Sequence, residues 1–208
     1  MYTPPHFAES DPQQILNLLR RHSFATVITH DGSAPFATHL PVLHHAEGGA
    51  HGTLITHMAR ANPQWRHFAD EREVLVIFHG PHAYISPNWY ETRPMVPTWN
   101  YATVHAYGVP RVIEDKDALR TMLRELVDTF EVSQPQPYGN VLTDDYIDQL
   151  SPGIVGLEIP INRLEAKFKL SQNRTLADQT GVIAALEKSA DQTERELAEM
   201  MKQAGSPS

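Results

Sequence analysis

The sequence contains no cysteine among its 208 residues. Disulfides, thiolate nucleophiles, iron–sulfur clusters and cysteine-based zinc sites are therefore excluded. Long hydrophobic runs are also missing, because apolar stretches such as VLVIF at 74–78 fall far short of the roughly 20 residues of a membrane span. The first residues, MYTPPHFAES, show neither the basic start nor the apolar core of a secretory signal. We therefore expect a cytoplasmic protein without a membrane segment.

Lysine is absent from the first 110 residues, which carry six arginines. Residues 111–208 carry 11 basic and 17 acidic residues, and the formal net charge of the chain is −8. Neither half offers the basic face that neutralises the phosphates of duplex DNA. No helix-turn-helix pattern with a basic recognition helix is present either. The charge thus argues against direct binding to nucleic acid.

Alternating apolar and polar residues predict antiparallel strands at 24–29, 34–43, 51–57, 73–78, 99–113 and 153–161. Asp31-Gly32 is a strong hairpin signal between the first two. Helical periodicity predicts helices at about 11–22 and 115–130 and within 175–203. Neither GxGxxG nor GxxxxGK[ST] occurs, and strands and helices do not alternate regularly. We predict an α+β fold, mainly β, namely a small β-barrel with helical additions.

Histidine is unusually frequent, and all 12 histidines lie between His6 and His105. Adjacent side chains of a regular strand point to opposite faces, so His44 and His45 would not chelate one ion together. His79 and His82 flank Gly80-Pro81, which is typical of a turn, but no acidic partner lies close by. We predict no metal site, and a structural metal at this turn is the alternative.

The stretch THMARANPQW at 56–65 places several anion-binding features directly after an apolar strand. Asn62-Pro63 is typical of a helix start, whose free N–H groups and dipole favour negative charge. Arg60 lies two residues earlier, and a guanidinium can form a bidentate contact with a phosphate. The pattern is compatible with a phosphate site, but an ordinary capped turn beside a solvated arginine is the simpler interpretation of these residues alone.

Several longer motifs carry a resemblance to a known family: MYTPPHF at 1–7, GTLITHMARANPQW at 52–65, VLVIFHGPHAYISPNWY at 74–90, VPTWNYATVHAYG at 96–108 and KLSQNR at 169–174. With these motifs the chain resembles the PaiB-like branch of the FMN-binding split-barrel flavoproteins, which are related to the pyridoxamine-phosphate oxidase fold. The resemblance implies a split-barrel domain over residues 1–174 with a helical insertion at about 115–150, followed by a helical extension over 175–208. It also implies a homodimer with one FMN in each of two clefts between subunits.

By the same resemblance, the loop after the third strand holds the FMN phosphate, which here matches Thr56, His57, Arg60 and Asn62. The flanking segment whose backbone follows the isoalloxazine edge matches Thr38, His39, Leu40 and Pro41. A further group would complete the cleft from the partner subunit: Trp99, Asn100, Lys169, Ser171, Gln172 and Asn173. The related oxidases use more cations in the phosphate loop than Met58-Ala59-Arg60 provides, so FMN affinity is expected to be modest.

Two functions are compatible with such a site. PaiB-like proteins are described as negative transcriptional regulators, associated in the namesake with protease production and sporulation, whereas a bound flavin would also suit an FMN-dependent oxidoreductase. His39 or His57, as imidazolium, could stabilise a reduced, anionic flavin. No catalytic pattern specifies a substrate, so the sequence leaves enzymatic activity open. The alternative is a haem-binding or haem-degrading split-barrel protein with haem as its cofactor and His6, His57, His79 or His105 as candidate ligands.

Overall fold

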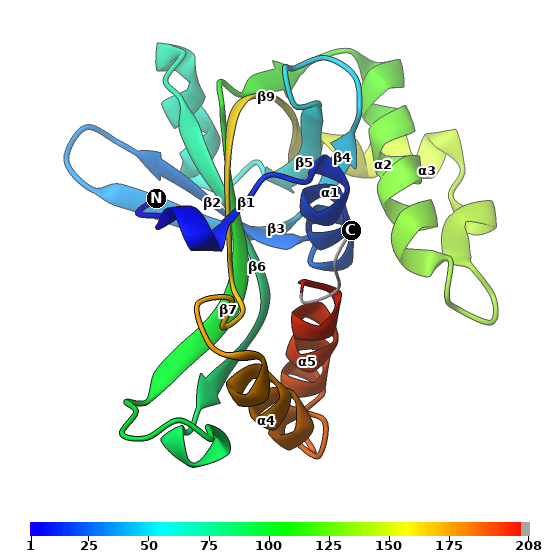
Figure 1. Ribbon diagram of the computed structural model, residues 1–208. Helices are drawn as coiled ribbons and strands as arrows, with labels where there is room; N and C mark the ends of the chain where they lie inside the picture. Colours follow the sequence, from blue (N-terminus) through cyan, green and yellow to red (C-terminus); the bar gives the residue numbers. More distant parts are fainter. Residues whose placement is uncertain (205–208) are drawn as a thin grey trace. The chain divides into compact units, whose positions relative to one another are not determined.

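The computed structural model describes residues 1–204, apart from the side chains at positions 70, 139 and 140. Within this range the chain forms an antiparallel sheet in the order β3-β2-β6-β7-β9-β5-β4, and β1 and β8 each pair with β9 (Figure 1). The strands are β1 (Ala8–Glu9), β2 (Phe24–His30), β3 (Pro35–Pro41), β4 (Leu43–His45), β5 (Thr53–Ala59), β6 (Val74–Ile85), β7 (Thr98–Gly108), β8 (Arg111–Ile113) and β9 (Ile154–Lys169).

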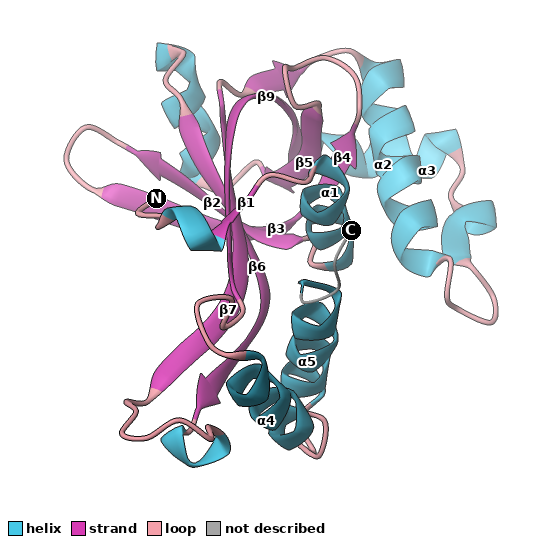
Figure 2. Cartoon of the chain, in the orientation of Figure 1, coloured by secondary structure: helices cyan, strands magenta, loops and turns pink. Residues whose placement is uncertain are grey.

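Helices occur between the strands and after the last strand (Figure 2). The α-helices are α1 (Pro12–Arg21), α2 (Lys116–Glu131), α3 (Asp144–Leu150), α4 (Leu176–Leu186) and α5 (Gln192–Ala204). Short 3₁₀ helices are η1 (Pro5–Phe7), η2 (Pro63–Asp70), η3 (Pro87–Trp89), η4 (Tyr138–Val141) and η5 (Ser151–Gly153). The predicted α+β class, mainly β with helical additions, is confirmed.

The chain divides into two compact units. Unit 1 comprises residues 1–18, 79–104 and 165–208, and unit 2 comprises residues 19–78 and 105–164. The long strands β6, β7 and β9 contribute residues to both units. The expected boundary between a barrel domain over 1–174 and a helical extension over 175–208 stays a prediction. The last four residues of that extension, 205–208, lie outside the described residues.

In unit 2, the β2–β3 hairpin pairs Phe24 with Pro41 at one end and His30 with Pro35 at the other. The turn forms as its sequence predicts. Asp31 Oδ1 accepts hydrogen bonds from the backbone N–H groups of Ser33 and Ala34, both at 2.7 Å, and Gly32 adopts a φ of +102°. These N–H groups, that of Ala34 first, lower the pKa of Asp31 to about 2. A carboxylate with two backbone donors fixes the turn and therefore the register of the hairpin.

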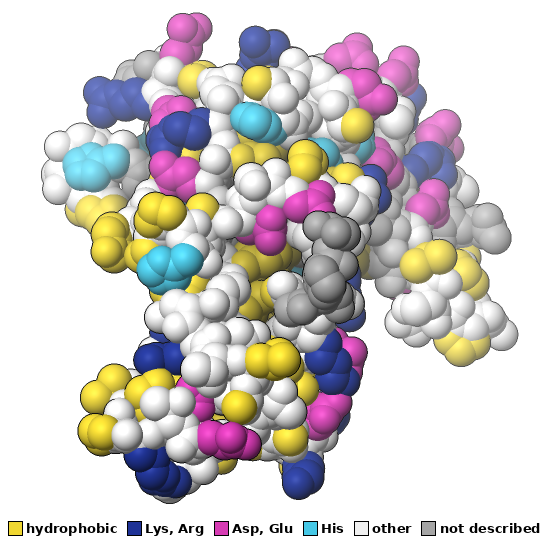
Figure 3. Space-filling view, in the orientation of Figure 1, with side chains coloured by type: hydrophobic (Ala, Val, Ile, Leu, Met, Phe, Trp, Pro, Cys, Tyr) yellow, Lys and Arg dark blue, Asp and Glu magenta, His cyan; other side chains and the backbone are white. Residues whose placement is uncertain are grey.

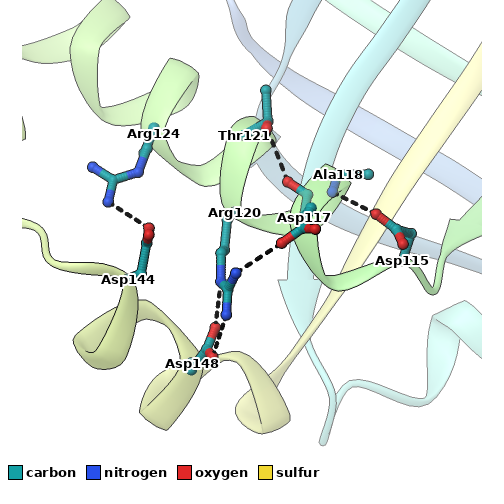
Figure 4. A network of polar contacts seen from close by, with 8 residues as sticks. All are labelled: Asp115, Asp117, Ala118, Arg120, Thr121, Arg124, Asp144 and Asp148. Atoms are coloured by element: carbon teal, nitrogen blue, oxygen red, sulfur yellow. Dashed lines mark hydrogen bonds and ion pairs between the residues drawn. The ribbon is translucent and has the colours of Figure 1, made fainter.

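Charged side chains of both signs are interspersed over the face of the molecule shown in Figure 3. Ion pairs fasten α3 to α2 within unit 2 (Figure 4). Arg120 donates two hydrogen bonds to the two carboxylate oxygens of Asp148, at 2.7 and 2.5 Å, and Arg124 donates one to Asp144 at 2.7 Å. On the opposite side of α2, Met122 and Leu126 pack with Leu43 and Ile55 in a buried cluster, along the stripe that the sequence predicts.

In unit 1, the expected turn at Gly80-Pro81 is wrong, because β6 runs without a break from Val74 to Ile85. Burial alternates along this strand but changes phase at the Gly-Pro pair, where two consecutive residues are buried. Glycine is needed at position 80, because a Cβ there would lie 3.0 Å from the carbonyl oxygen of Ala102 and 2.9 Å from Leu18 Cδ1. The Gly-Pro pair therefore shifts which face each side chain occupies instead of ending the strand.

Candidate functional site

The turn between β5 and η2 is built by its own polar groups. Asn62 caps η2: its side-chain oxygen accepts a hydrogen bond from the Gln64 N–H at 3.0 Å, and Pro63 follows at the first helical position. The Asn62 side-chain amide also donates to Thr38 Oγ1 on β3 at 2.9 Å. The predicted helix start at Asn62-Pro63 is thus confirmed, although the helix is 3₁₀ rather than α. Asn62 and Thr38, both predicted site residues, lie in contact.

A buried glutamine anchors this turn to the sheet. Gln64 is fully buried, and its Nε2 lies within hydrogen-bond distance of Val27 O (2.9 Å), Thr29 Oγ1 (3.1 Å) and Phe36 O (3.2 Å). It therefore connects η2 to both strands of the β2–β3 hairpin. The helical pattern of 62–70 did not single out this residue, since a polar residue in such a pattern is usually exposed.

Two arginine side chains lie near the indole ring of Trp65. The guanidinium carbon of Arg60 lies 5.9 Å from the ring centroid and that of Arg66 lies 5.6 Å from it. Trp65 is itself held in place, because its Nε1–H donates to the Arg60 carbonyl at 3.0 Å. Among the side chains that the structure describes, neither guanidinium pairs with a carboxylate. Sequence reasoning missed Arg66, because nothing in the spacing shows that Trp65 brings the two cations together.

Arg60 is oriented by backbone carbonyls of η5 and of the first residue of β9. Its Nε donates to the Pro152 carbonyl at 2.9 Å and one Nη2–H donates to the Ile154 carbonyl at 2.8 Å. A guanidinium has five N–H donors, so three remain available on this exposed side chain. The two carbonyl contacts already restrict the Arg60 side chain, so that binding an anion would cost less conformational entropy.

The remaining predicted residues of β3 and β5 differ in accessibility. His39 is exposed and stacks against Phe24 with ring centroids 6.2 Å apart, whereas Leu40 is buried and Pro41 is half-buried. Thr56 is fully buried, and its hydroxyl donates to the Pro41 carbonyl at 2.6 Å. Thr56 thus joins β5 to the end of β3, and its side chain is committed to that contact.

His57 lies on the opposite face of β5 from Thr56. It shares that face with Ile55, which packs against α2, and it pairs across the strands with Gly156, where a Cβ would meet Leu119. Burial lowers the pKa of His57, so its imidazole is neutral at neutral pH. Its Nδ1 atom is buried without a hydrogen-bond partner. The lowered pKa disfavours the imidazolium form expected of His57 beside a reduced flavin, and this role stays a prediction.

The second group of predicted residues lies in unit 1, around the end of β9. Trp99 is 53% exposed, and Lys169, which is half-buried, donates hydrogen bonds to Thr98 Oγ1 and to the Trp99 carbonyl. In contrast, Asn100 and Ser171 are buried and bonded to one another, with Asn100 Nδ2 donating to Ser171 Oγ at 2.8 Å. The same amide lies 3.6 Å from the sulfur of Met201 on α5.

The loop after β9 is held by its own side chains. Ser171 has a φ of +66°, a left-handed conformation that is unfavourable for a residue with a side chain. The exposed Gln172 supports it, because its amide donates to the Phe168 carbonyl at 2.5 Å and its oxygen accepts from the Leu170 N–H at 2.7 Å. Asn173, the last predicted residue, is exposed beside it. This loop places Lys169 next to Trp99.

His44 and His45 have separate partners. His44 Nε2 lies 2.9 Å from the His51 carbonyl oxygen, and His45 Nε2 lies 2.6 Å from Glu125 Oε1. Among the described residues there is no group of three or more His, Asp or Glu side chains that could hold a metal ion. A search of the same residues finds no helix with the length and apolar character to cross a membrane.

Comparison with known proteins identifies the family. The family described as "Putative FMN-binding domain" matches residues 1–163. The chain belongs to this family. It is 38% identical over 203 residues, 97% of each chain, to the "Protease synthase and sporulation protein PAI 2" of Bacillus subtilis.

Two solved structures show the same fold at low identity. The FAD and haem binding protein from Mycobacterium smegmatis has a TM-score of 0.62 at 18% identity, covering 86% of this chain and 79% of that one. The flavocytochrome Anf3 from Azotobacter vinelandii also has a TM-score of 0.62, at 16% identity, covering 81% and 70%. The predicted FMN-binding split-barrel fold is confirmed, and FMN is the cofactor of the family.

The residues present fit the charged end of FMN. A phosphate monoester carries about −1.5 to −2 charges at neutral pH. Arg60 and Arg66 supply two positive charges beside a capped helix start, and described carboxylates pair with neither. Arg66 is thus a second cation near this turn, in addition to the one in Met58-Ala59-Arg60.

Proposed function

We propose that the protein is an FMN-dependent redox protein that binds the FMN phosphate at the turn formed by Arg60, Asn62 and Arg66. The observation that supports this most directly is the pair of guanidinium groups around Trp65, which described carboxylates leave without a partner. Arg60 provides the bidentate contact, Arg66 adds the second charge, and the capped start of η2 adds a favourable dipole. Gln64 and Asn62 keep the turn in register with β3.

The flavin ring, in this proposal, lies along the edge strand β3, where His39 is exposed and Leu40 and Pro41 end the strand. FMN supplies hydride and electron transfer when it is bound, and the protein supplies binding and orientation. His57, neutral and beneath α2, supports β5 and does not contribute charge. Thr56 likewise holds β5 against Pro41.

We further propose that two chains form a homodimer and that Trp99 and Lys169 of one chain complete the flavin site of the other. Both residues are accessible on unit 1, as such a contribution requires. Asn100, Ser171 and Gln172 hold the loop that carries Lys169 rather than touching the cofactor with their side chains, and Asn173 lies at its exposed edge. Sedimentation equilibrium should give twice the 23.4 kDa of one chain. A flavin-loaded protein with the mass of a single chain would refute this part of the proposal.

A role in transcription is the second candidate, favoured by the 38% identity to a protein named for protease synthesis and sporulation. The net charge of −8 and the interspersed surface charges favour action through a partner rather than through DNA. An electrophoretic mobility shift at low salt tests this: we expect no shift with promoter fragments, and a specific shift would contradict the indirect route.

The cofactor is tested by the absorbance spectrum of freshly purified protein together with arginine variants. Flavin bands are expected, whereas a Soret band would favour the haem alternative. The Arg60→Ala and Arg66→Ala variants should each retain less FMN after gel filtration. Arg111→Ala is the matched control, since Arg111 is an exposed arginine on β8 in the same unit. Equal FMN retention in all three variants would refute the phosphate assignment.

A further inference from the structure

Three cations gather on unit 1 without a described acidic partner. Lys167, Lys169 and Arg174 lie on the end of β9 and the loop that follows it. Lys167 donates to the Tyr2 carbonyl at 3.2 Å, Lys169 to Thr98 and the Trp99 carbonyl, and Arg174 lies 3.6 Å from Met95 Sδ. All of these acceptors are neutral, and no described carboxylate forms an ion pair with any of the three.

This arrangement is costly in the absence of an anion. Lys167 is only 8% exposed and Lys169 is half-buried, and removing an ammonium group from water without a countercharge is unfavourable. The pKa of Lys169 is lowered by burial and further by the charges of Lys167 and Arg174. A negative charge bound beside Lys169 would offset all three effects at once.

Aromatic side chains also gather on the strands of unit 1, on β6 and β7. Trp99 and Tyr84 are both exposed, with ring centroids 6.1 Å apart, and the ring of His82 lies 6.2 Å from that of Trp99. Trp99 and Tyr101 alternate with the buried Asn100 along β7 and so share one face of the strand. The Lys167 ammonium lies 5.3 Å from the Tyr101 ring centroid, which places Lys167 on that aromatic face, and Lys169 follows two residues later on the same side of β9.

We propose that this face, defined by His82, Tyr84, Trp99, Tyr101, Lys167 and Lys169, binds a planar aromatic anion. The negatively charged group lies at Lys169 and the ring lies along Trp99. This proposal rests on the proposed redox function, because it assigns a chemical class to the substrate of the proposed flavin site. Binding itself requires only residues of unit 1, so it is measurable without flavin.

The test is an NMR titration of flavin-free protein with benzoate, followed at the Trp99 indole N–H, which a Trp99→Phe variant assigns. Benzamide has the same ring without the charge, and acetate has the charge without the ring. We expect saturable binding of benzoate and binding at least about tenfold weaker for both analogues. Equal affinity for benzamide and benzoate, or no saturable shift with benzoate, would overturn the proposal.

Variants locate the charge. Lys169→Met should weaken benzoate binding at least about tenfold, whereas Lys169→Arg should keep it. Lys188→Met, which removes an exposed lysine after α4, is the matched control and should bind as the wild type does. Unchanged binding in Lys169→Met, or loss in Lys169→Arg as large as in Lys169→Met, would contradict the assignment.

The two proposals fail independently. Arg60→Ala should lose FMN and still bind benzoate in its flavin-free form, because Arg60 belongs to the other unit. The aromatic-anion proposal requires that flavin-free Lys169→Met loses benzoate binding, whether or not this variant still retains FMN. If Arg60→Ala loses FMN as expected but its flavin-free form does not bind benzoate, only the aromatic-anion proposal is refuted.

Discussion

Replacing Gln64 tests whether the phosphate turn is fixed by the sheet beneath it. The Nε2 group carries two hydrogens and lies near three acceptors, so it makes at most two good hydrogen bonds at a time. Each contributes about 1–1.5 kcal/mol net, which gives about 2–3 kcal/mol in total. Gln64 Oε1 is buried without a partner, and an apolar side chain of similar size would remove that penalty, worth about 1 kcal/mol.

The expected magnitudes follow from this difference. Gln64→Leu should lower the free energy of unfolding by about 1–2 kcal/mol, since the lost bonds are partly offset. Gln64→Ala also leaves a cavity at a fully buried site and should cost about 3–4 kcal/mol. Among the three variants, the stability of Gln64→Glu should depend most strongly on pH. Its buried carboxyl would face three oxygen acceptors, so its ionisation would cost free energy.

Urea unfolding followed by circular dichroism measures these changes, with the slope of the transition as a check for two-state behaviour. Gln13→Leu is the control, because Gln13 is exposed on α1 and bonds only to Asn17 one turn away, a contact worth about 0.2–0.5 kcal/mol. The reasoning would be refuted if Gln64→Ala and Gln13→Leu had the same effect on stability.

Two further predictions concern carboxylates. The pKa of Asp178 is lowered by the backbone N–H groups of Thr92 and Glu91. The ionised carboxylate therefore stabilises the fold above its unfolded pKa of about 3.9, and this stabilisation is lost as the pH falls through the lower pKa of the folded state. The difference in urea midpoint between wild type and Asp178→Asn should therefore shrink between about pH 6 and pH 3, and a constant difference would contradict this. The pKa of Asp148 is lowered by its hydrogen bonds with Arg120, so Arg120→Met should raise it toward about 3.9 in an NMR titration, whereas an unchanged pKa would show that the pair contributes nothing.

Local signals predicted the parts of the fold that depend on neighbouring residues. Asp31-Gly32 gives the hairpin, Asn62-Pro63 gives the helix start, and the stripe of Met122 and Leu126 gives the buried face of α2. The expected turn at Gly80-Pro81 failed, because this pair also occurs where a strand changes phase. The close approach of the Ala102 carbonyl oxygen to Gly80 distinguishes a strand that changes phase from a turn. This contact is tertiary, so the local sequence does not show it.

The candidate site was predictable to a smaller degree for a related reason. Arg60 and Asn62 follow from the capped turn, but the approach of both Arg60 and Arg66 to the Trp65 ring depends on the folded conformation of the turn. Thr56 and His57 are adjacent in the sequence, and strand geometry sends them to opposite faces, so both side chains cannot serve one phosphate. Asn100 and Ser171 are polar residues that satisfy one another in the interior, which no sequence pattern distinguishes from ligand contacts.

The central claim, that the turn around Trp65 binds the phosphate of FMN, is tested most directly by comparing FMN with riboflavin, which has the same ring system and no phosphate. Affinities of both for the flavin-free wild type and Arg60→Ala are measured by fluorescence quenching at one ionic strength. A charge-assisted contact of about 1.5–3 kcal/mol predicts that Arg60→Ala weakens FMN roughly 10- to 150-fold and leaves riboflavin unchanged. An equal loss for both flavins, or no loss of FMN affinity, would contradict the claim.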